Sequence, residues 1–144
     1  MTTTYNYKAN KIVCVLSNKL DAGAAMNIVG HLCLAVGRYA PLDIMGRERL
    51  TDLSNVAHVG IAKYPLIVTQ VKPSTVRKAV EQARLNPQLI VADFPQQMLD
   101  TRHDDELAEA LSMAVEPSLD YLGAVVYGPR EEVDAITGKY SLWK

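Results

Sequence analysis

Four short apolar runs alternate along the chain with longer segments in which apolar residues recur at helical spacing. The runs cover residues 11–17, 64–71, 89–93 and 121–128. Short runs rich in Val and Ile, bounded by polar residues, are typical of strands that are buried on both faces. Pro65 fits the second run because it stands at the start, where a missing N–H is tolerated. The pattern therefore predicts four strands.

The intervening segments predict four helices. They are expected over residues 24–39, between Pro73 and Asn86, over residues 104–115, and from Pro129 onward. In the first segment Ile28, Leu32 and Val36 recur on one face, and Pro41 follows its end. Acidic residues open the third helix, where the helix dipole favours negative charge. The region 42–63 carries mixed signals, and its conformation is left open.

The alternation of strands and helices predicts an α/β fold. We expect a three-layer α/β/α sandwich with a mixed, mostly parallel sheet of about four strands, because strands joined through helices usually run parallel between two helical layers. The chain has 144 residues, without an internal repeat or a Gly/Ser-rich linker, so residues 1–144 are expected to form a single domain. In such sheets ligands lie beyond the carboxyl ends of strands, which directs attention to residues 17–23 and 93–97.

The charge balance argues against nucleic-acid binding. The formal net charge is −1, and positive side chains are interspersed with negative ones, as where Arg47 and Arg49 flank Glu48. Binding to nucleic acid is driven largely by Lys and Arg side chains that neutralise phosphates. On these charge grounds tRNA is not an expected partner.

The positions of the cysteines and histidines indicate where the protein is located and whether it binds a metal or another cofactor. Cys14 and Cys33 lie within apolar segments, which is typical of buried thiols in a reducing compartment, so a cytoplasmic location is expected. No apolar stretch reaches the roughly 18 residues of a membrane helix, so no membrane association is expected. His31, His58 and His103 share no short ligand spacing, so neither a metal nor another cofactor is predicted.

Two segments at opposite ends of the chain resemble those of one known family. The segment 124–142, AVVYGPREEVDAITGKYSL, contains a Gly-Pro, a Val-Asp and a Thr-Gly pair, and it resembles the closing strand and helix of type II peptidyl-tRNA hydrolases. The opening strand and glycine turn, residues 11–23, look like the beginning of that family. The resemblance implies a peptidyl-tRNA hydrolase II-like fold and, through the family's habit of dimerising, a homodimer.

The resemblance weakens at the positions that carry the chemistry. In the hydrolases the first helix carries a lysine proposed to hold the substrate and, one turn later, a glutamine, whereas the chain has Asn27 and His31. Asp93 corresponds to an aspartate that follows the family's third strand. Where the hydrolases have a short threonine-bearing loop, the chain inserts residues 94–120 with an acidic helix. That insertion is expected to bring negative charge toward the site.

An uncharacterised group placed beside those hydrolases resembles the chain more closely. It has Asn and His at the two helix positions and a Lys-Tyr-Pro entry to the second strand. In this sequence these residues are Asn27, His31, Lys63, Tyr64 and Pro65. The resemblance to that group implies a fold but no established activity.

The catalytic candidates are Asn27, His31 and Asp93. Asn27 and His31 are four residues apart on one predicted helix, so an amide and an imidazole are neighbours on its surface. An imidazole can act as an acid or a base near neutral pH, and a carboxylate such as Asp93 could orient it. The alternative is that both helix residues hydrogen-bond buried backbone atoms and have no chemical role.

Four further residues are candidates for substrate binding. Lys19 and Asp21 occupy the turn after the first strand, where a positive group could meet an anionic ligand, or where both could be solvated. His58 and Lys63 lie in and beside the uncertain segment, and they could approach the same crevice if that segment folds over it as a lid.

Two functions remain open at this point. The first is a hydrolase that acts on an ester or amide, a peptidyl ester included, with His31 and Asp93 sharing acid-base work and Asn27 polarising the carbonyl. The second is a non-catalytic module that binds a small molecule or a protein and has lost the family's lysine. The sequence leaves undecided whether the protein is an enzyme.

Overall fold

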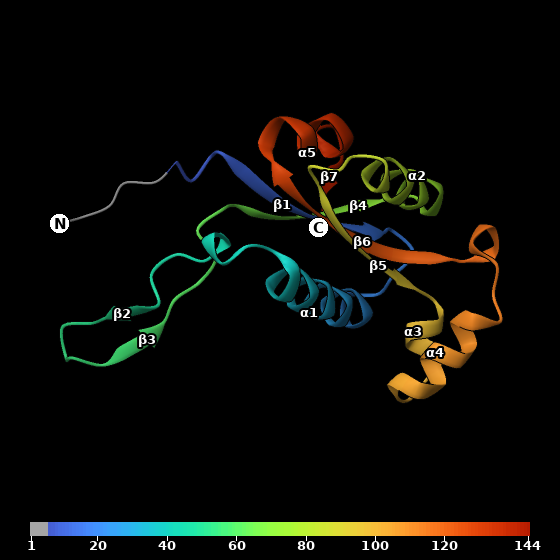
Figure 1. Ribbon diagram of the computed structural model, residues 1–144, viewed down its shortest axis with the longest axis horizontal. Helices are drawn as coiled ribbons and strands as arrows, with labels where there is room; N and C mark the ends of the chain where they lie inside the picture. Colours follow the sequence, from blue (N-terminus) through green and yellow to red (C-terminus); the bar gives the residue numbers. More distant parts are fainter. Residues whose placement is uncertain (1–5) are drawn as a thin grey trace.

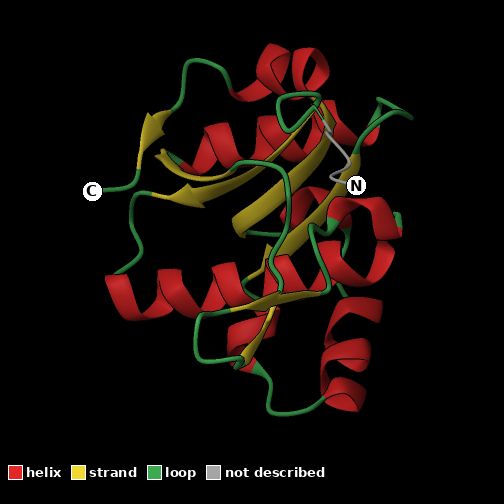
Figure 2. Ribbon diagram, turned by 90° about the vertical axis from the view of Figure 1, so that its left-hand side faces the viewer, coloured by secondary structure: helices red, strands yellow, loops and turns green. Residues whose placement is uncertain are grey.

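The computed structural model describes residues 6–144, and these are organised around a five-stranded sheet (Figures 1 and 2). The strand order across the sheet is β5-β6-β1-β4-β7. The strands are β1 (Asn10–Ser17), β4 (Leu66–Val71), β5 (Ile90–Pro95), β6 (Tyr121–Pro129) and β7 (Ser141–Leu142). Four of them stand where the apolar runs predicted strands, and the short β7 is additional.

The sheet is mixed, as expected, but the expectation that it is mostly parallel, with about four strands, is wrong: it has five strands, and most neighbouring pairs are antiparallel. Among neighbouring strands of this sheet, β1 and β4 form the one parallel pair, whereas β6 pairs antiparallel with β1 and β5, and β7 with β4. Strands β1, β4 and β5 therefore run in one direction, and β6 and β7 in the other. The reason lies in the inserted segment 96–120. It leaves β5 after Pro95 and returns beside it, since Pro95 pairs with Tyr121, so the next strand must run back in the opposite direction.

Helices cover both faces of the sheet, as both views show (Figures 1 and 2). The covering helices are α1 (Ala22–Tyr39), α2 (Pro73–Arg84) and α5 (Arg130–Thr137). Side chains on β1 alternate between two clusters: Ile12, Cys14 and Leu16 pack on the side of α1, while Val13 and Val15 pack with α2 and α5. The alternation is the two-residue period of a strand buried on both faces.

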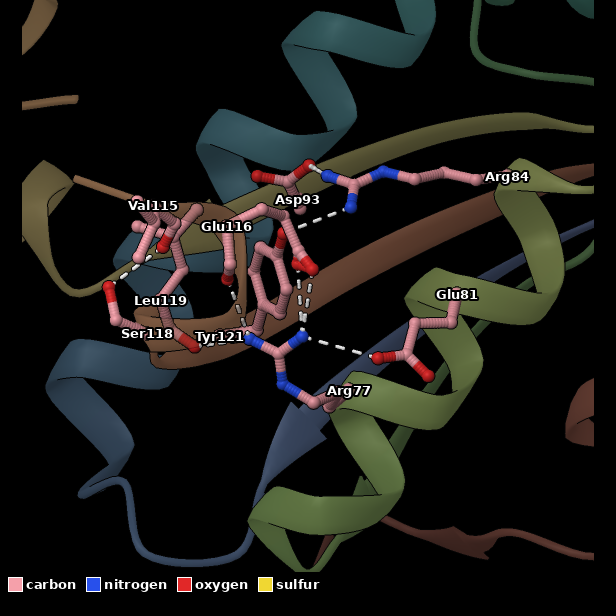
Figure 3. A network of polar contacts seen from close by, with 9 residues as sticks. All are labelled: Arg77, Glu81, Arg84, Asp93, Val115, Glu116, Ser118, Leu119 and Tyr121. Atoms are coloured by element: carbon pink, nitrogen blue, oxygen red, sulfur yellow. Dashed lines mark hydrogen bonds and ion pairs between the residues drawn. The ribbon is translucent and has the colours of Figure 1, made fainter. Parts of the chain in front are cut away.

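The segment between β5 and β6 forms the helices α3 (Gln97–Asp100) and α4 (Asp104–Ser112) and the turn η2 (Glu116–Ser118). Arg77 of α2 fastens this segment to the body (Figure 3). Its guanidinium donates to the carbonyl of Leu119 at 2.6 Å and to the carbonyl of Glu116 at 3.1 Å, and it also contacts the Glu116 carboxylate at 3.0 Å. The insertion is therefore anchored at its return to the sheet.

Residues 46–61 form a two-stranded arm that projects from the body beyond the end of α1 (Figure 1). After the turn η1 (Leu42–Ile44), the arm contains β2 (Arg49–Thr51) and β3 (Ala57–Val59), and all residues of both strands are exposed. Asn55 at its tip has a φ of 65°. The carboxylate of Asp52 accepts the N–H of Ser54 at 2.8 Å and that of Val56 at 3.1 Å, so local hydrogen bonds shape the turn.

The last residues close the outer edge of the sheet. Ser141 and Leu142 pair with β4, and the N–H of Trp143 donates to the carbonyl of Val68 at 2.9 Å. The Trp143 side chain packs against the apolar cluster on the side of α1. Within residues 6–144 no helix combines the length and the apolar character needed to cross a membrane.

Candidate functional site

A cleft of about 370 Å³ opens where α1, the end of β5 and the inserted helices meet, and we call it the α1–α4 cleft. Its apolar lining residues are Leu32, Ala35, Ala92, Phe94, Met98 and Leu107. Its polar lining residues are His31, Asp93, Thr101, Arg102, His103 and Asp104. The cleft thus combines an apolar lining with polar groups from three parts of the chain.

His31 reaches the cleft from the exposed side of α1. Its ring lies 6.0 Å from the ring of Phe94, centroid to centroid, in a tilted arrangement. Within the described part of the chain, neither imidazole nitrogen has a hydrogen-bond partner. The aromatic contact holds the ring while its nitrogens stay available to a ligand.

Asp93 lines the same cleft, but its carboxylate is bound elsewhere. The Oδ2 atom accepts from Nη2 of Arg84 at 2.6 Å, and the same guanidinium donates to the Tyr121 hydroxyl at 3.0 Å (Figure 3). Arg84 belongs to α2, on the face of the sheet opposite α1. Because side chains alternate along a strand, Phe94 faces α1 and Asp93 points to the other side. No hydrogen bond among residues 6–144 joins His31 to Asp93.

Asn27 and His31 lie together, as their spacing predicted. Both are exposed on α1, and they line one shallow depression with Gly30. The side chain of Asn27 makes no hydrogen bond within residues 6–144. Neither Asn27 nor His31 is therefore hydrogen-bonded to buried backbone atoms of that range. The depression adjoins the α1–α4 cleft through His31, which lines both.

The four other candidates lie away from the cleft lining. Asp21 is the N-cap of α1 and accepts the N–H of Ala24 at 2.8 Å, and Lys19 is an exposed neighbour in the preceding turn. His58 stands on the arm, with its Nε2 2.8 Å from Oδ2 of Asp52. Lys63 places its Nζ 5.2 Å from the centroid of the Tyr64 ring. The structure gives these residues local contacts and does not bring them to the cleft.

The insertion supplies cleft residues that sequence reasoning missed. The guanidinium of Arg102 is exposed and has no ion-pair or hydrogen-bond partner within residues 6–144. His103 is the N-cap of α4, and its Nδ1 accepts the N–H of Glu106 at 3.2 Å. In the neutral ring the proton therefore sits on Nε2, which lies 3.8 Å from the Glu106 carboxylate. The sequence signal that could have identified His103 as an N-cap is its position directly before the acidic first turn of the helix.

The lining restricts the chemistry of the cleft. Among its lining residues within the described range, the hydroxyl group belongs to Thr101, which donates to the carbonyl of Gln97 at 2.8 Å. No cysteine or serine nucleophile lines the cleft. Among residues 6–144 no group of three His, Cys, Asp or Glu side chains is arranged to hold a metal ion. The chemical capacity that remains is hydrogen bonding by His31, Arg102 and His103 over an apolar lining.

The comparisons with known proteins bear on family and fold. A family model described as a protein of unknown function, DUF2000, matches residues 10–144. The solved structure of a protein of unknown function from Agrobacterium tumefaciens strain C58 is similar, with 20% sequence identity and a TM-score of 0.82, over 94% of this chain and 98% of that one. At this identity the likeness concerns the fold alone. The search of curated proteins found no match.

Proposed function

Because the chain belongs to the DUF2000 family, whose description assigns no activity, we propose a function from the α1–α4 cleft itself: it binds a small organic monocarboxylate. The observation that carries the proposal is a pair of donors, His31 and Arg102, whose side chains have no hydrogen-bond or ion-pair partner within residues 6–144 and lie beside an apolar lining. A volume of about 370 Å³ lies in the range of small-molecule sites. The apolar lining packs against the hydrocarbon part of the ligand, and the two donors hydrogen-bond to its carboxylate.

The charges around the cleft favour one negative charge on the ligand over several. The carboxylate of Asp93 is neutralised by Arg84 at 2.6 Å. Asp104, however, lines the cleft, and Asp105 and Glu106 continue the acidic first turn of α4. A polyanion would meet these carboxylates, whereas a monocarboxylate can be held on the side of Arg102. This charge pattern gives no support to a polyphosphate or a tRNA as the ligand.

Calorimetry with matched probes tests the proposal. Phenylacetate and hexanoate are titrated into the native protein, with phenylacetamide and hexanamide as uncharged controls. We expect the carboxylates to bind and the amides to bind more weakly, and we expect Arg102→Gln and His31→Ala each to weaken carboxylate binding by about tenfold or more, the range for a charge-assisted hydrogen bond.

The control for charge is Arg49→Gln. Arg49 is exposed on the arm, where its side chain donates to the Glu48 carbonyl. Its replacement removes the same charge from the chain without touching the cleft. Equal weakening by Arg49→Gln and Arg102→Gln, or no binding of any probe to the native protein, would overturn the proposal.

A hydrolase acting on an ester or amide is the second candidate. It is favoured by one observation: the imidazole of His31, which has no hydrogen-bond partner within residues 6–144, lines the cleft and adjoins the exposed Asn27. Peptidyl-tRNA and a simple carboxylic ester are incubated with the native protein and with His31→Ala. Turnover that His31→Ala abolishes would support this candidate. Equal, background-level release by both proteins would remove it and leave the binding function.

A further inference from the structure

The two cysteines of the chain meet on the α1 side of the sheet, away from the α1–α4 cleft. Cys14 lies on β1 and is fully buried, while Cys33 lies on α1 and is half-buried. Cys33 packs against the apolar cluster that contains Cys14, and both thiols are free. One thiol is thus enclosed, and its neighbour stands between it and the surface.

A second cavity, of about 100 Å³, gives access to Cys33, and we call it the thiol pocket. It lies beside the last turns of α1 and is lined by Val36, Gly37, Ile44 and Leu66 together with the cysteine. Its other lining residues are also apolar, and it shares no residue with the α1–α4 cleft. A small apolar molecule can therefore reach one thiol of the pair.

The two thiols differ in reactivity. Interaction with the neighbouring Cys14 thiol lowers the pKa of Cys33 to about 7, although burial works in the opposite direction. Interaction with Cys33, together with burial, raises the pKa of Cys14. A thiolate is the reactive form of cysteine. Near neutral pH the accessible sulfur is therefore the nucleophile, and the enclosed one stays a thiol.

We propose that Cys33 reduces organic hydroperoxides that enter the thiol pocket, and that Cys14 then closes a disulfide with it. The proposal is independent of the ligand bound in the α1–α4 cleft. The occupant is an organic hydroperoxide because the pocket lining offers apolar contact to a hydrocarbon body.

The reaction balances in two steps. The Cys33 thiolate attacks the terminal oxygen of the hydroperoxide, the O–O bond breaks, and the departing alkoxide takes up a proton and leaves as the alcohol. The oxidised Cys33 is a sulfenic acid, which the Cys14 sulfur attacks to form the S–S bond while the hydroxyl leaves with the thiol proton as water. One hydroperoxide and two thiols thus give one alcohol, one water and one disulfide, and a dithiol reductant restores both thiols.

Mass spectrometry of the oxidised protein tests the assignment of the two cysteines. The reduced protein is mixed with cumene hydroperoxide and quenched. We expect the native chain to lose both thiols, to gain an intramolecular disulfide and to release one equivalent of the alcohol. Cys14→Ala is expected to stop at the sulfenic acid, which dimedone traps, and Cys33→Ala to stay reduced. Two intact thiols in the native chain, or equally fast oxidation of Cys33→Ala, would overturn the proposal.

A second pair of variants tests the pocket without altering either sulfur. Gly37 lines the thiol pocket and Gly30 does not. Both are exposed on α1, and a Cβ at either would meet no atom within 4 Å, so neither variant is strained. Gly37→Leu is expected to slow oxidation by cumene hydroperoxide by about tenfold, the scale of a few methylenes in an apolar pocket, and Gly30→Leu to leave the rate unchanged. Equal rates in the two variants would contradict entry through this pocket.

Discussion

The arm and the central strand β1 both contain apolar side chains, but those of the arm are exposed and those of β1 are buried. Residues 12–17 of β1 are all buried, whereas every strand residue of the arm is exposed, Val59 at 71%. The difference is coverage, because helices lie over both faces of β1 and none lies over the arm. A two-stranded hairpin alone is marginal in water. Packing should therefore stabilise the sheet, and backbone and turn hydrogen bonds should stabilise the arm.

The largest expected effect on stability comes from a substitution in the packed body. Leu32 on α1 is 2% exposed, while Leu34, two residues on, is 75% exposed. Leu32→Ala is expected to lower the free energy of unfolding by about 2–5 kcal/mol, through lost transfer energy and a cavity. Leu34→Ala is the matched control and should change it by about 0.5 kcal/mol or less. Chemical denaturation measures both, and similar losses would show that α1 is not packed as described.

A smaller effect is expected when the base of the arm is opened. A Cβ at Gly60 would collide with the backbone carbonyl of Arg47, and the N–H of Gly60 donates to the Glu48 carbonyl at 3.0 Å. Gly60→Ala should leave global unfolding nearly unchanged while the amides of the arm exchange faster with solvent. Hydrogen exchange measures this, with Gly30→Ala as the control. A loss of global stability as large as that of Leu32→Ala would mean that the arm supports the body.

Acid should loosen the tip of the arm. The hydrogen bond from His58, followed by the N–H groups of Val56 and Ser54, lowers the pKa of Asp52 below its ordinary value. Since the folded arm holds this pKa below that of the unfolded chain, the stabilisation is fully present above the unfolded value and is lost as pH falls through the folded one. We expect the amide of Val56 to shift in NMR spectra over that range. In Asp52→Asn the shift should be absent, and its persistence there would contradict the assignment.

The smallest effect on stability is expected at the tip. Leu53 is fully exposed, so Leu53→Asp should change the free energy of unfolding by about 0.5 kcal/mol or less. The homodimer implied by the resemblance stays a prediction. If it forms, we expect the second copy to cover the exposed apolar side chains of the arm. Light scattering should give twice the chain mass for the native protein and a lower mass for Leu53→Asp. Equal masses would exclude the tip from a dimer contact.

The same contrast explains what could be predicted from the sequence. The apolar runs that became β1, β4, β5 and β6 were visible because helices bury both faces of these strands, so their side chains are continuously apolar. The arm could not be assigned, because its strands bury nothing and therefore carry no alternation. Strand direction was predicted wrongly. Hydrophobic periodicity reports which residues are buried but not the end of the sheet at which a connection such as residues 96–120 returns.

The candidate site was predictable only in part. Helical spacing placed Asn27 beside His31 correctly. The expected partnership of His31 with Asp93 required knowing which alternate residues of β5 face α1, and Phe94 takes that side. Arg102 and His103 joined the cleft through the fold of the insertion, which the sequence showed only as an acidic helix.

The short C-terminal strand gives the protein an optical probe of its own edge. The chain has a single tryptophan, Trp143, and its backbone N–H is bonded to β4 at Val68. Its emission therefore follows the detachment of the last residues from that edge, while circular dichroism follows the helices. If fluorescence changes at lower denaturant than circular dichroism, the gap between the curves measures fraying of one strand and is not evidence of a global intermediate.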